Sequence, residues 1–394
     1  MNARTDNWRL LVLIYLYGVV SAASLTKAIP LQEHVIGLPG AGPGSFALFV
    51  SLMAVLPALL GTLSGAIIDR IGARPALIIS ALVGAAANAL YLFSNSISGF
   101  MVIRLLEGAV PLCAYAAAPA LMIAVSAPQR RSAAMSLWST YTPVGTSLGL
   151  LISATSASSE HWRSAYALHG AVFVIMALLG LFLPRTRPTP PGARSSTLAL
   201  LASREGIEPL RLALTFGVLI FLGLGVSVVY PGYLSQLHDM SLARASSILA
   251  GANLTMILGS MLSGVLLTRG MTTSALFLAL TVVGSISGIG SFAPWPWLGA
   301  NLATLLLWQV CTGAAMAICA SLLPRVVTPA HRAAAAGLLS QTGAILTFIT
   351  PPVWVPAVAG QWIVPALIIV AGWILAAVLL PRPASTPAAA PARG

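Results

Sequence analysis

The sequence predicts an all-α membrane protein in which twelve transmembrane helices form two pseudo-symmetric six-helix bundles. Three observations support this fold class. Hydrophobic residues make up 58% of the 394 positions and charged residues only 7%, whereas a soluble domain carries about 25% charged residues. The chain divides into twelve long apolar runs, and two short motifs recur about 200 residues apart. So few charges cannot cover a water-facing surface, which indicates that lipid is the main solvent.

Each apolar run is long enough to cross the hydrocarbon core, which takes about 20 residues in a helix. Helices are expected because backbone polar groups in lipid must be hydrogen-bonded within the segment. The runs do not show the short alternating segments of a membrane β-barrel. The predicted spans are 9–29, 44–68, 75–94, 99–123, 133–155, 164–183, 210–230, 242–267, 272–293, 297–323, 334–356 and 362–380.

One connection between the runs is much longer than the others. Residues 184–209 are rich in Pro, Arg and Ser, which predicts a linker between two halves. We therefore expect one six-helix bundle over residues 1–183 and a second over residues 210–380. Residues 381–394 are rich in Pro and Ala, and this composition predicts a disordered tail.

The basic residues predict the orientation in the membrane. With the N-terminus in the cytoplasm, sixteen Arg residues lie on the cytoplasmic side, and Lys27, Arg163 and Arg244 lie on the outer side. Positive residues are concentrated in cytoplasmic loops, so both termini and the linker are predicted to be cytoplasmic, in a bacterial inner membrane. Lys27 is expected to anchor the chain at the outer interface, where its long side chain reaches water.

Several function classes are excluded by what the sequence lacks. The net charge of +12 comes from scattered Arg residues, whereas nucleic-acid binding needs a clustered basic face. The three cysteines stand in apolar runs without a metal-binding spacing, and GxxxxGK[ST], the phosphate-binding signature of ATPases, is absent. No catalytic grouping is present. We therefore expect no enzyme activity, no cofactor and no metal, and an ion or solute gradient as the energy source.

The two halves carry related motifs. LSGAIIDRIG at 63–72 resembles LSGVLLTRG at 262–270, and APQRRSAAM at 127–135 resembles TPAHRAAAAG at 328–337. The offsets are 199 and 201 residues. Two independent echoes at nearly the same offset indicate a duplicated six-helix unit, and parallel repeats of this kind occur in a large class of transporters.

The first of these motifs resembles the loop signature of the major facilitator superfamily, Gly-x-x-x-Asp-Arg-x-Gly-Arg-Arg. The matching residues are Gly65, Asp69, Arg70, Gly72 and Arg74, and Ala73 replaces the first Arg of the closing pair. Gly65 lets two helices approach closely, and Gly72 permits a tight turn. A carboxylate near a helix N-terminus is favoured by about 0.3–1 kcal/mol. The resemblance implies that Asp69 contacts the start of the eleventh span and latches the halves together; a plain loop charge is the alternative.

Further segments are similar to the same family. RLLEGAVP at 104–111 keeps the Arg and the Gly four residues later that family members carry in the fourth span. TPVGTSLG at 142–149 is partly similar to the Gly/Pro-rich fifth span of proton-coupled exporters, and HWRSAY at 161–166 resembles the usual entry to the sixth span. The resemblance therefore covers nearly the whole chain and implies the fold of this superfamily.

Arg104 and Glu107 are the charges that the sequence places deep inside a span. An ionisable residue at that depth costs roughly 2.5–3.5 kcal/mol on insertion scales and is a functional candidate. The two residues share a helix face because they are three positions apart. Two interpretations stay open: a structural ion pair, or a site in which Glu107 exchanges a proton and Arg104 tunes it or holds an anionic substrate. The resemblance implies that this span lines the central cavity.

Other polar and aromatic residues are cavity candidates by their position in the spans, although each could instead make a hydrogen bond between packed helices. These candidates are Tyr17, Tyr115, Tyr141, Asn253, Trp308, Gln309 and Gln341.

The sequence therefore predicts a secondary active transporter that works by alternating access and is coupled to protons. Its expected partners are a small organic substrate, protons and the lipid bilayer, and we expect a monomer. Two types within the superfamily stay open: a drug or metabolite exporter driven by proton antiport, and a cyanate-permease-like carrier that takes up small organic anions. A transporter-like sensor and a lipid flippase are the alternatives outside this class.

Overall fold

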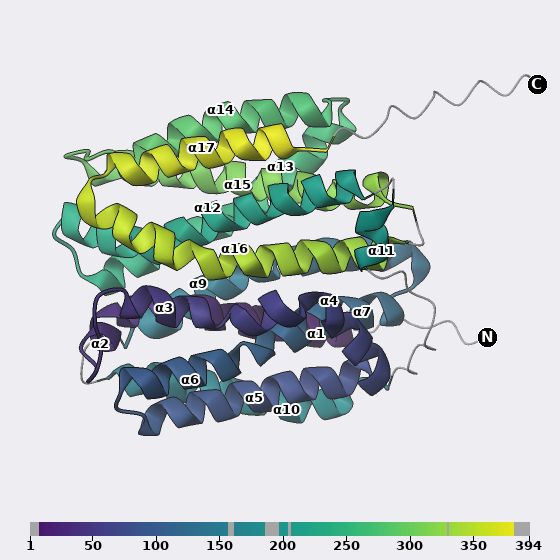
Figure 1. The fold of residues 1–394 in the computed structure, drawn as a ribbon, viewed down its shortest axis with the longest axis horizontal. Helices are drawn as coiled ribbons and strands as arrows, with labels where there is room; N and C mark the ends of the chain where they lie inside the picture. Colours follow the sequence, from purple (N-terminus) through teal and green to yellow (C-terminus); the bar gives the residue numbers. More distant parts are fainter. Residues whose placement is uncertain (1–7, 157–160, 186–196, 204–205, 329–330, 382–394) are drawn as a thin grey trace, which may run out of the picture.

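The structure, a computed structural model, describes residues 8–156, 161–185, 197–203, 206–328 and 331–381. All regular elements in these ranges are helices, and the long ones lie side by side along one axis (Figure 1). The predicted all-α membrane architecture is confirmed for this part of the chain.

The first group of helices, here called the N-terminal half, lies in the lower part of Figure 1. Its elements are α1 (Trp8–Thr26), η1 (Ile29–Leu31), α2 (Gln32–Ile36), α3 (Ser45–Leu52), α4 (Val55–Ile71), α5 (Ala73–Phe93), α6 (Ile97–Glu107), α7 (Ala109–Val125), η2 (Pro128–Arg130), α8 (Arg131–Ser139), α9 (Tyr141–Ala154), α10 (Trp162–Leu179) and η3 (Gly180–Phe182).

The second group, here called the C-terminal half, lies in the upper part of Figure 1 and follows the short helix α11 (Thr197–Ala202). Its elements are α12 (Ile207–Leu237), α13 (Leu242–Thr268), α14 (Thr273–Phe292), α15 (Leu298–Val326), α16 (Arg332–Gly360) and α17 (Ile363–Leu379). Helix α11 lies at the same end of the molecule as the last turn of α17, and α2 lies at the opposite end.

Most predicted spans correspond to helices of membrane-crossing length. Ten helical segments in the described ranges are long and apolar enough to cross a membrane, and α17 is a shorter apolar helix of 17 residues. The remaining predicted span, 133–155, consists of α8 and α9, which are separated at Thr140. Other spans are also interrupted: α6 gives way to α7 at Gly108, where an added Cβ would lie 2.6 Å from the Met53 carbonyl oxygen. Close packing at that point therefore requires a glycine.

Local sequence signals explain where several helices begin. Ser96, Ser241 and Thr272 stand just before α6, α13 and α14, and each side-chain oxygen accepts a hydrogen bond from the backbone N–H three residues later. These bonds satisfy N–H groups that have no partner inside the helix. The reversal between α4 and α5 occurs at Gly72, whose φ of +89° favours glycine. Gly270 has a φ of +92° at the reversal between α13 and α14, so the motif at 63–72 and its echo at 262–270 both end on a glycine of positive φ.

Part of the segment that was predicted as a linker is helical in the structure. Within residues 184–209, Thr197–Ala202 form α11 and Ile207 begins α12. Helix α11 packs against α16 through Leu200, which is buried with Val327, Ala334 and Ala335. The sequence TLALLA is short but apolar, and a buried surface on α16 stabilises it. Residues 186–196 of the linker and the predicted tail beyond Pro381 lie outside the described residues.

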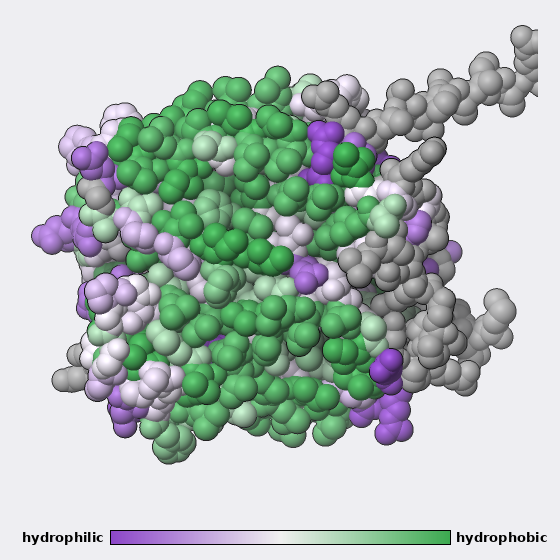
Figure 2. All heavy atoms as spheres, viewed as in Figure 1, coloured by the Kyte–Doolittle hydropathy of each residue, from purple (hydrophilic) through white to green (hydrophobic). Residues whose placement is uncertain are grey.

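The surface is apolar where lipid is expected. Figure 2 shows hydrophobic side chains across the middle of the molecule and hydrophilic ones gathered at its two ends. Large apolar side chains such as Leu59, Leu278 and Ile286 are more than 60% exposed. In water, contiguous apolar surface of this kind would drive association; in a bilayer it is the expected solvent contact.

The two halves pack on each other mainly through two helix pairs, with further contacts of α3 on α16 and of η1 on α12 and α13. Helix α9 packs against α13, and α4 packs against α16. In the second pair, an added Cβ on Gly61 would lie 3.2 Å from Cα and Cβ of Gln341. Gln341 Nε2 also donates a hydrogen bond of 2.9 Å to the carbonyl oxygen of Ala58. The halves are therefore in direct contact along α4 and α16.

Candidate functional site

Three charged side chains are buried together inside the N-terminal half, and we call Lys27, Arg104 and Glu107 the ionic cluster. Lys27 Nζ lies 2.6 Å from Glu107 Oε1, and Arg104 Nη1 lies 2.9 Å from Glu107 Oε2. The exposed fractions are 1% for Lys27 and 0% for the other two side chains. One carboxylate thus pairs with two cations at a depth where an unpaired charge would be expensive.

The arginine of the cluster also completes the end of α1. Arg104 Nη1 donates to the carbonyl oxygen of Ser24 at 2.8 Å, and Nη2 donates to that of Leu25 at 3.3 Å. These carbonyls belong to the last turn of α1, where carbonyl groups have no partner within the helix. A cation there also interacts favourably with the helix dipole. Arg104 therefore ties α6 to the end of α1, and its guanidinium lies over the Phe49 ring at 5.2 Å.

Helices α5 and α10 supply the other contacts of the ionic cluster. Asn88 Oδ1 accepts a hydrogen bond of 2.7 Å from Lys27 Nζ, and Tyr91 Oη donates to Glu107 Oε2 at 3.3 Å. Lys27 Nζ lies 5.5 Å from the centre of the Tyr91 ring and 5.1 Å from that of Tyr166. All of these partners belong to the N-terminal half. The cluster is thus enclosed by one six-helix bundle rather than by the contact between the halves.

The prediction that Lys27 anchors the chain at the outer interface was wrong. The apolar segment that contains Lys27 continues through η1 and α2 to Ile36, so Lys27 lies inside the span rather than at its end. Arg104 and Glu107 are consequently not the only charges at depth. The sequence could not distinguish these locations, because a lone lysine near the end of an apolar run fits both the membrane interface and the interior of a helix bundle. Only a partner distant in sequence decides between them.

A hydrogen-bonded network of uncharged side chains connects the halves. Gln309 Nε2 of α15 donates to Asn253 Oδ1 of α13, and Asn253 Nδ2 donates to Thr146 Oγ1 of α9 at 3.4 Å. Thr26 Oγ1, at the end of α1, donates to the Thr146 carbonyl oxygen at 2.7 Å. We call Thr26, Thr146, Asn253 and Gln309 the interface network. Asn253 and Gln309 were predicted candidates, whereas the two threonines were not, because isolated Thr residues in a span carry no distinctive sequence signal.

The remaining cavity candidates lie at four different places. Tyr17 Oη donates to the Met176 carbonyl oxygen of α10 at 2.6 Å, inside the N-terminal half. The rings of Tyr115 and Tyr141 lie 5.0 Å apart, between α7 and α9. Trp308 is buried within the C-terminal half beside Gly288. Gln341 bonds Ala58 across the two halves. The seven candidates thus do not converge on one site.

The residues of the loop signature surround the reversal between α4 and α5. Gly65 lies within α4 and Arg70 is exposed near its end. Arg74 Nη2 donates to the Leu181 carbonyl oxygen at 2.9 Å, which ties this loop to the end of α10 and η3. The Asp69 side chain, on which the latch prediction depends, lies outside the described residues.

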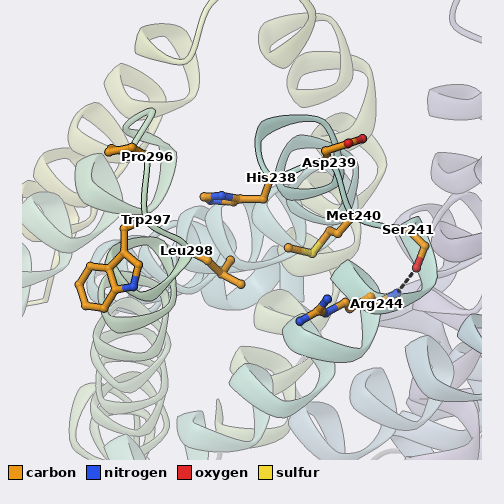
Figure 3. Close-up of a pocket in the computed structure, with 8 residues that line it drawn as sticks. All are labelled: His238, Asp239, Met240, Ser241, Arg244, Pro296, Trp297 and Leu298. Carbon is orange, nitrogen blue, oxygen red and sulfur yellow. Dashed lines mark hydrogen bonds between the residues drawn. The ribbon is translucent and has the colours of Figure 1, made fainter.

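A surface cavity of about 450 Å³ lies between the α12–α13 turn and the α14–α15 loop (Figure 3), at the end of the molecule opposite α11 (Figure 1). His238 and Arg244 point into it, Asp239 points away, and Trp297 stands at its side. No predicted candidate lines this cavity. Among the described residues, no three His, Cys, Asp or Glu side chains gather as a metal site would require.

Comparison with known proteins identifies the family of this chain. Residues 9–351 match the sequence profile of the Major Facilitator Superfamily. Major facilitator superfamily domain-containing protein 10 of Bos taurus is 27% identical over 208 residues, which are 50% of this chain and 42% of that protein. Multidrug resistance protein MdtM of Salmonella typhimurium is 30% identical over 152 residues, 38% of this chain and 35% of that protein. Each match spans less than half of the relative's length.

Solved structures share the fold. A bacterial homologue of the human lysosomal transporter Spinster, in an inward-facing and occupied conformation, superposes with a TM-score of 0.73 at 15% identity, covering 96% of this chain and 95% of that one. A mutant of the nucleoside transporter NupG superposes with a TM-score of 0.72 at 14% identity, covering 94% and 98%. The predicted architecture of two six-helix bundles is therefore shared with solved transporters.

Proposed function

Because this chain belongs to the Major Facilitator Superfamily, we propose that it moves a small organic solute across the bacterial inner membrane by alternating access, coupled to a change of protonation in the ionic cluster. The chain is a multi-pass membrane protein and a transporter rather than an enzyme. In the proposed orientation, the end of the molecule that holds α11, the start of α1 and the end of α17 faces the cytoplasm, as the asymmetry of Arg residues favours.

The observation that carries the proposed coupling is the fully buried ionic cluster. Ionisable side chains at this depth are costly and mark ion or proton sites in membrane proteins. Lys27, Arg104 and Glu107 lie in the N-terminal half, and Thr26, next to Lys27, belongs to the network that reaches the C-terminal half. A change of charge at the cluster therefore acts close to the contact that alternating access must open and close.

Two substrate types are supported by different observations. Similarity to a multidrug resistance protein supports export by proton antiport. The ionic cluster, with two cations and one carboxylate, supports uptake of a small organic anion, because an anion that approaches Arg104 in an open state would balance its charge. The proposed partners are this solute and protons, with the protein acting as a monomer.

The loop between α4 and α5 is proposed to act as the latch between the halves. Gly61 lies four residues before Gly65 and packs against Gln341, so α4 and α16 are in contact within the first half of α16. In the proposed latch, the Asp69 carboxylate of α4 would strengthen this contact by interacting with the N-terminus of α16, where the helix dipole favours a negative charge.

The test combines binding with transport. Purified protein is heated with panels of hydrophobic cations, such as ethidium, and small organic anions, such as benzoate. Each stabilising solute is then tested in proteoliposomes with an imposed pH gradient. We expect at least one solute to accumulate only while the gradient lasts, and a protonophore to abolish accumulation. If no solute crosses faster than in empty liposomes, transport of these classes is wrong; if accumulation ignores the gradient, the proton coupling is wrong.

A matched pair of variants separates the two substrate types. Stabilisation by an anion that is lost in Arg104→Ala but kept in Arg163→Ala would favour uptake of an organic anion. Arg163 is a suitable control because it is an exposed arginine of the same half, stacked on Trp162 at 4.5 Å. Stabilisation by hydrophobic cations in all three proteins would favour export.

A further inference from the structure

We propose that Lys27, rather than Glu107, is the group that takes up and releases the coupled proton. This inference rests on the proposed proton coupling and assigns it to one atom, Lys27 Nζ. In one state of the cycle Nζ is an ammonium group. In the other it is an amine, after its proton has passed to water on the side that is then open.

The hydrogen bonds of Lys27 fit both of these forms. Nζ has two acceptors among the described residues, Asn88 Oδ1 at 2.7 Å and Glu107 Oε1 at 2.6 Å. An ammonium group has three N–H donors, but an amine has two and a lone pair. The amine therefore keeps both observed hydrogen bonds, and what it gives up is the cation–π attraction to the rings of Tyr91 and Tyr166, whose centres lie 5.5 and 5.1 Å from Nζ. Loss of this proton leaves no buried polar partner unsatisfied.

The hydrogen bonds of Glu107 do not fit a protonated form equally well. Its two oxygens receive hydrogen bonds from Lys27, Arg104 and Tyr91. A carboxylic acid must donate one O–H and has fewer lone pairs to offer. Two of the three neighbours are cations, which can only donate. Protonation of Glu107 would therefore replace an acceptor with an O–H donor that faces other donors, whereas deprotonation of Lys27 disturbs none of these hydrogen bonds.

Charge balance supports the same assignment. With all three side chains ionised, the ionic cluster carries two positive charges and one negative charge in a site that is no more than 1% exposed. Arg104 stays charged, because a guanidinium does not release its proton in proteins. Removing one proton from Lys27 leaves a neutral Arg104–Glu107 pair. Adding a proton to Glu107 would instead leave two buried cations without a carboxylate, which is far more costly.

The charged, titratable and amide groups around Lys27 come from α5, α6 and α10. They are Arg104 and Glu107 on α6, Asn88 and Tyr91 on α5, and Tyr166 and His169 on α10. His169 Nε2 lies 3.1 Å from the Val20 carbonyl oxygen, so it is held by α1 rather than by the cluster. Among these groups Glu107 is the only carboxylate, and the two tyrosines present ring faces to Nζ.

The position of Lys27 connects its charge to the contact between the halves. Lys27 directly follows Thr26, whose hydroxyl holds the Thr146 carbonyl of α9 at 2.7 Å. The Thr146 hydroxyl in turn accepts a hydrogen bond from Asn253 of the C-terminal half. The end of α1 is pulled toward Glu107 more strongly when Lys27 is charged. A change at Nζ therefore biases the helix end on which the interface network depends.

The first test uses the fact that the chain contains a single lysine. Full-length protein in lipid nanodiscs is labelled with ¹⁵N-lysine and with side-chain ¹³C-glutamate, and NMR spectra are recorded as the pH changes. We expect the one Nζ signal to convert from ammonium to amine within the range where the protein stays folded. The Glu107 carboxylate signal, assigned by its loss in Glu107→Gln, should remain ionised. Titration of Glu107 with an unchanged Nζ signal, or no titration of either group, would overturn the assignment.

The second test measures coupling. Lys27→Met keeps the length and apolar stem of the side chain but cannot bind a proton, and Lys27→Arg keeps a permanent charge. With the solute found in the survey above, we expect the ratio of accumulation driven by a pH gradient to counterflow exchange to fall at least tenfold in both variants. If wild-type accumulation depends on pH and Lys27→Met retains that dependence, Lys27 is not the proton carrier. If the wild-type protein shows no pH dependence, it is the proposed coupling that has failed.

Discussion

Lys27 and Glu107 lie 80 residues apart in the sequence but form a buried ion pair, with 2.6 Å between Nζ and Oε1. The pair brings the residue that follows α1 against the last residue of α6. Arg104 reinforces the contact from one turn earlier in α6 by bonding the carbonyls at the end of α1. Electrostatic attraction and helix-end hydrogen bonding therefore hold the same two elements together.

Glu107→Gln should strongly destabilise the protein. The change leaves two buried cations without a carboxylate, and removal of one partner of a buried pair costs about 3–5 kcal/mol. Thermal or denaturant unfolding of the purified protein in lipid–detergent micelles measures the loss. Glu208→Gln is the matched control, because Glu208 pairs with Arg211 at 28–30% exposure, where an ion pair contributes about 0–1 kcal/mol. Adding Lys27→Met to Glu107→Gln should restore part of the loss; equal stability of Glu107→Gln and wild type would contradict the buried pair.

Gly149→Ala should weaken the packing of α9 on α1. A Cβ at Gly149 would collide with the Ala23 carbonyl oxygen and the Thr26 hydroxyl. Overpacking of this kind costs about 1–3 kcal/mol, and here it would also displace an element of the interface network. Unfolding measurements should show the loss, together with reduced transport. Gly251→Ala is the control, since an added Cβ there meets no heavy atom within 4 Å. Indistinguishable effects of the two substitutions would argue against the close α1–α9 contact.

Gly72→Ala should destabilise the reversal between α4 and α5. The φ of +89° at Gly72 is rarely adopted by residues with a Cβ, and holding such a residue there costs about 1–3 kcal/mol. Gly264→Ala offers a control from the echoed motif, because Gly264 lies within α13 and has open space around its Cα. We expect a lower melting temperature for the first variant only. A normal melting temperature for Gly72→Ala would show that the loop tolerates another conformation.

A disulfide between α4 and α16 should stop transport by joining the halves. In a background with Cys113, Cys311 and Cys319 replaced by Ser, Gly61→Cys and Gln341→Cys place two Cβ atoms about as close as a disulfide requires. Oxidation should crosslink the two positions and abolish solute movement, and a reducing agent should restore it. The single-cysteine proteins under oxidation serve as controls. Full transport by the completely crosslinked protein would exclude movement of α4 against α16 during the cycle.

Much of the fold could be predicted because it follows from the solvent. A chain with so few charges can satisfy its backbone hydrogen bonds in lipid only through helices. The number of apolar runs of membrane-crossing length then sets the number of spans. The repeated motifs at 63–72 and 262–270 indicated the duplicated unit, and both end on a glycine of positive φ. The family resemblance rested on the same residues and is confirmed by the match over residues 9–351.

The site could be predicted only in part. Arg104 and Glu107 were identifiable because a charge inside an apolar run is conspicuous whatever its partner. Asn253 and Gln309 were identifiable as polar residues at depth, but Thr26 and Thr146 were not, since threonine is common in spans. The pairing of these residues across helices depends on packing directions that no local pattern encodes.

The sequence by itself determined the solvent, the helices and the depth of most charges, because these follow from hydropathy and length within single segments. Only the tertiary structure decided that Lys27 turns inward to Glu107 and Asn88 instead of outward to water. The reason is that the free energy of a buried charge depends on its partners, and those partners come from helices that are distant in the chain.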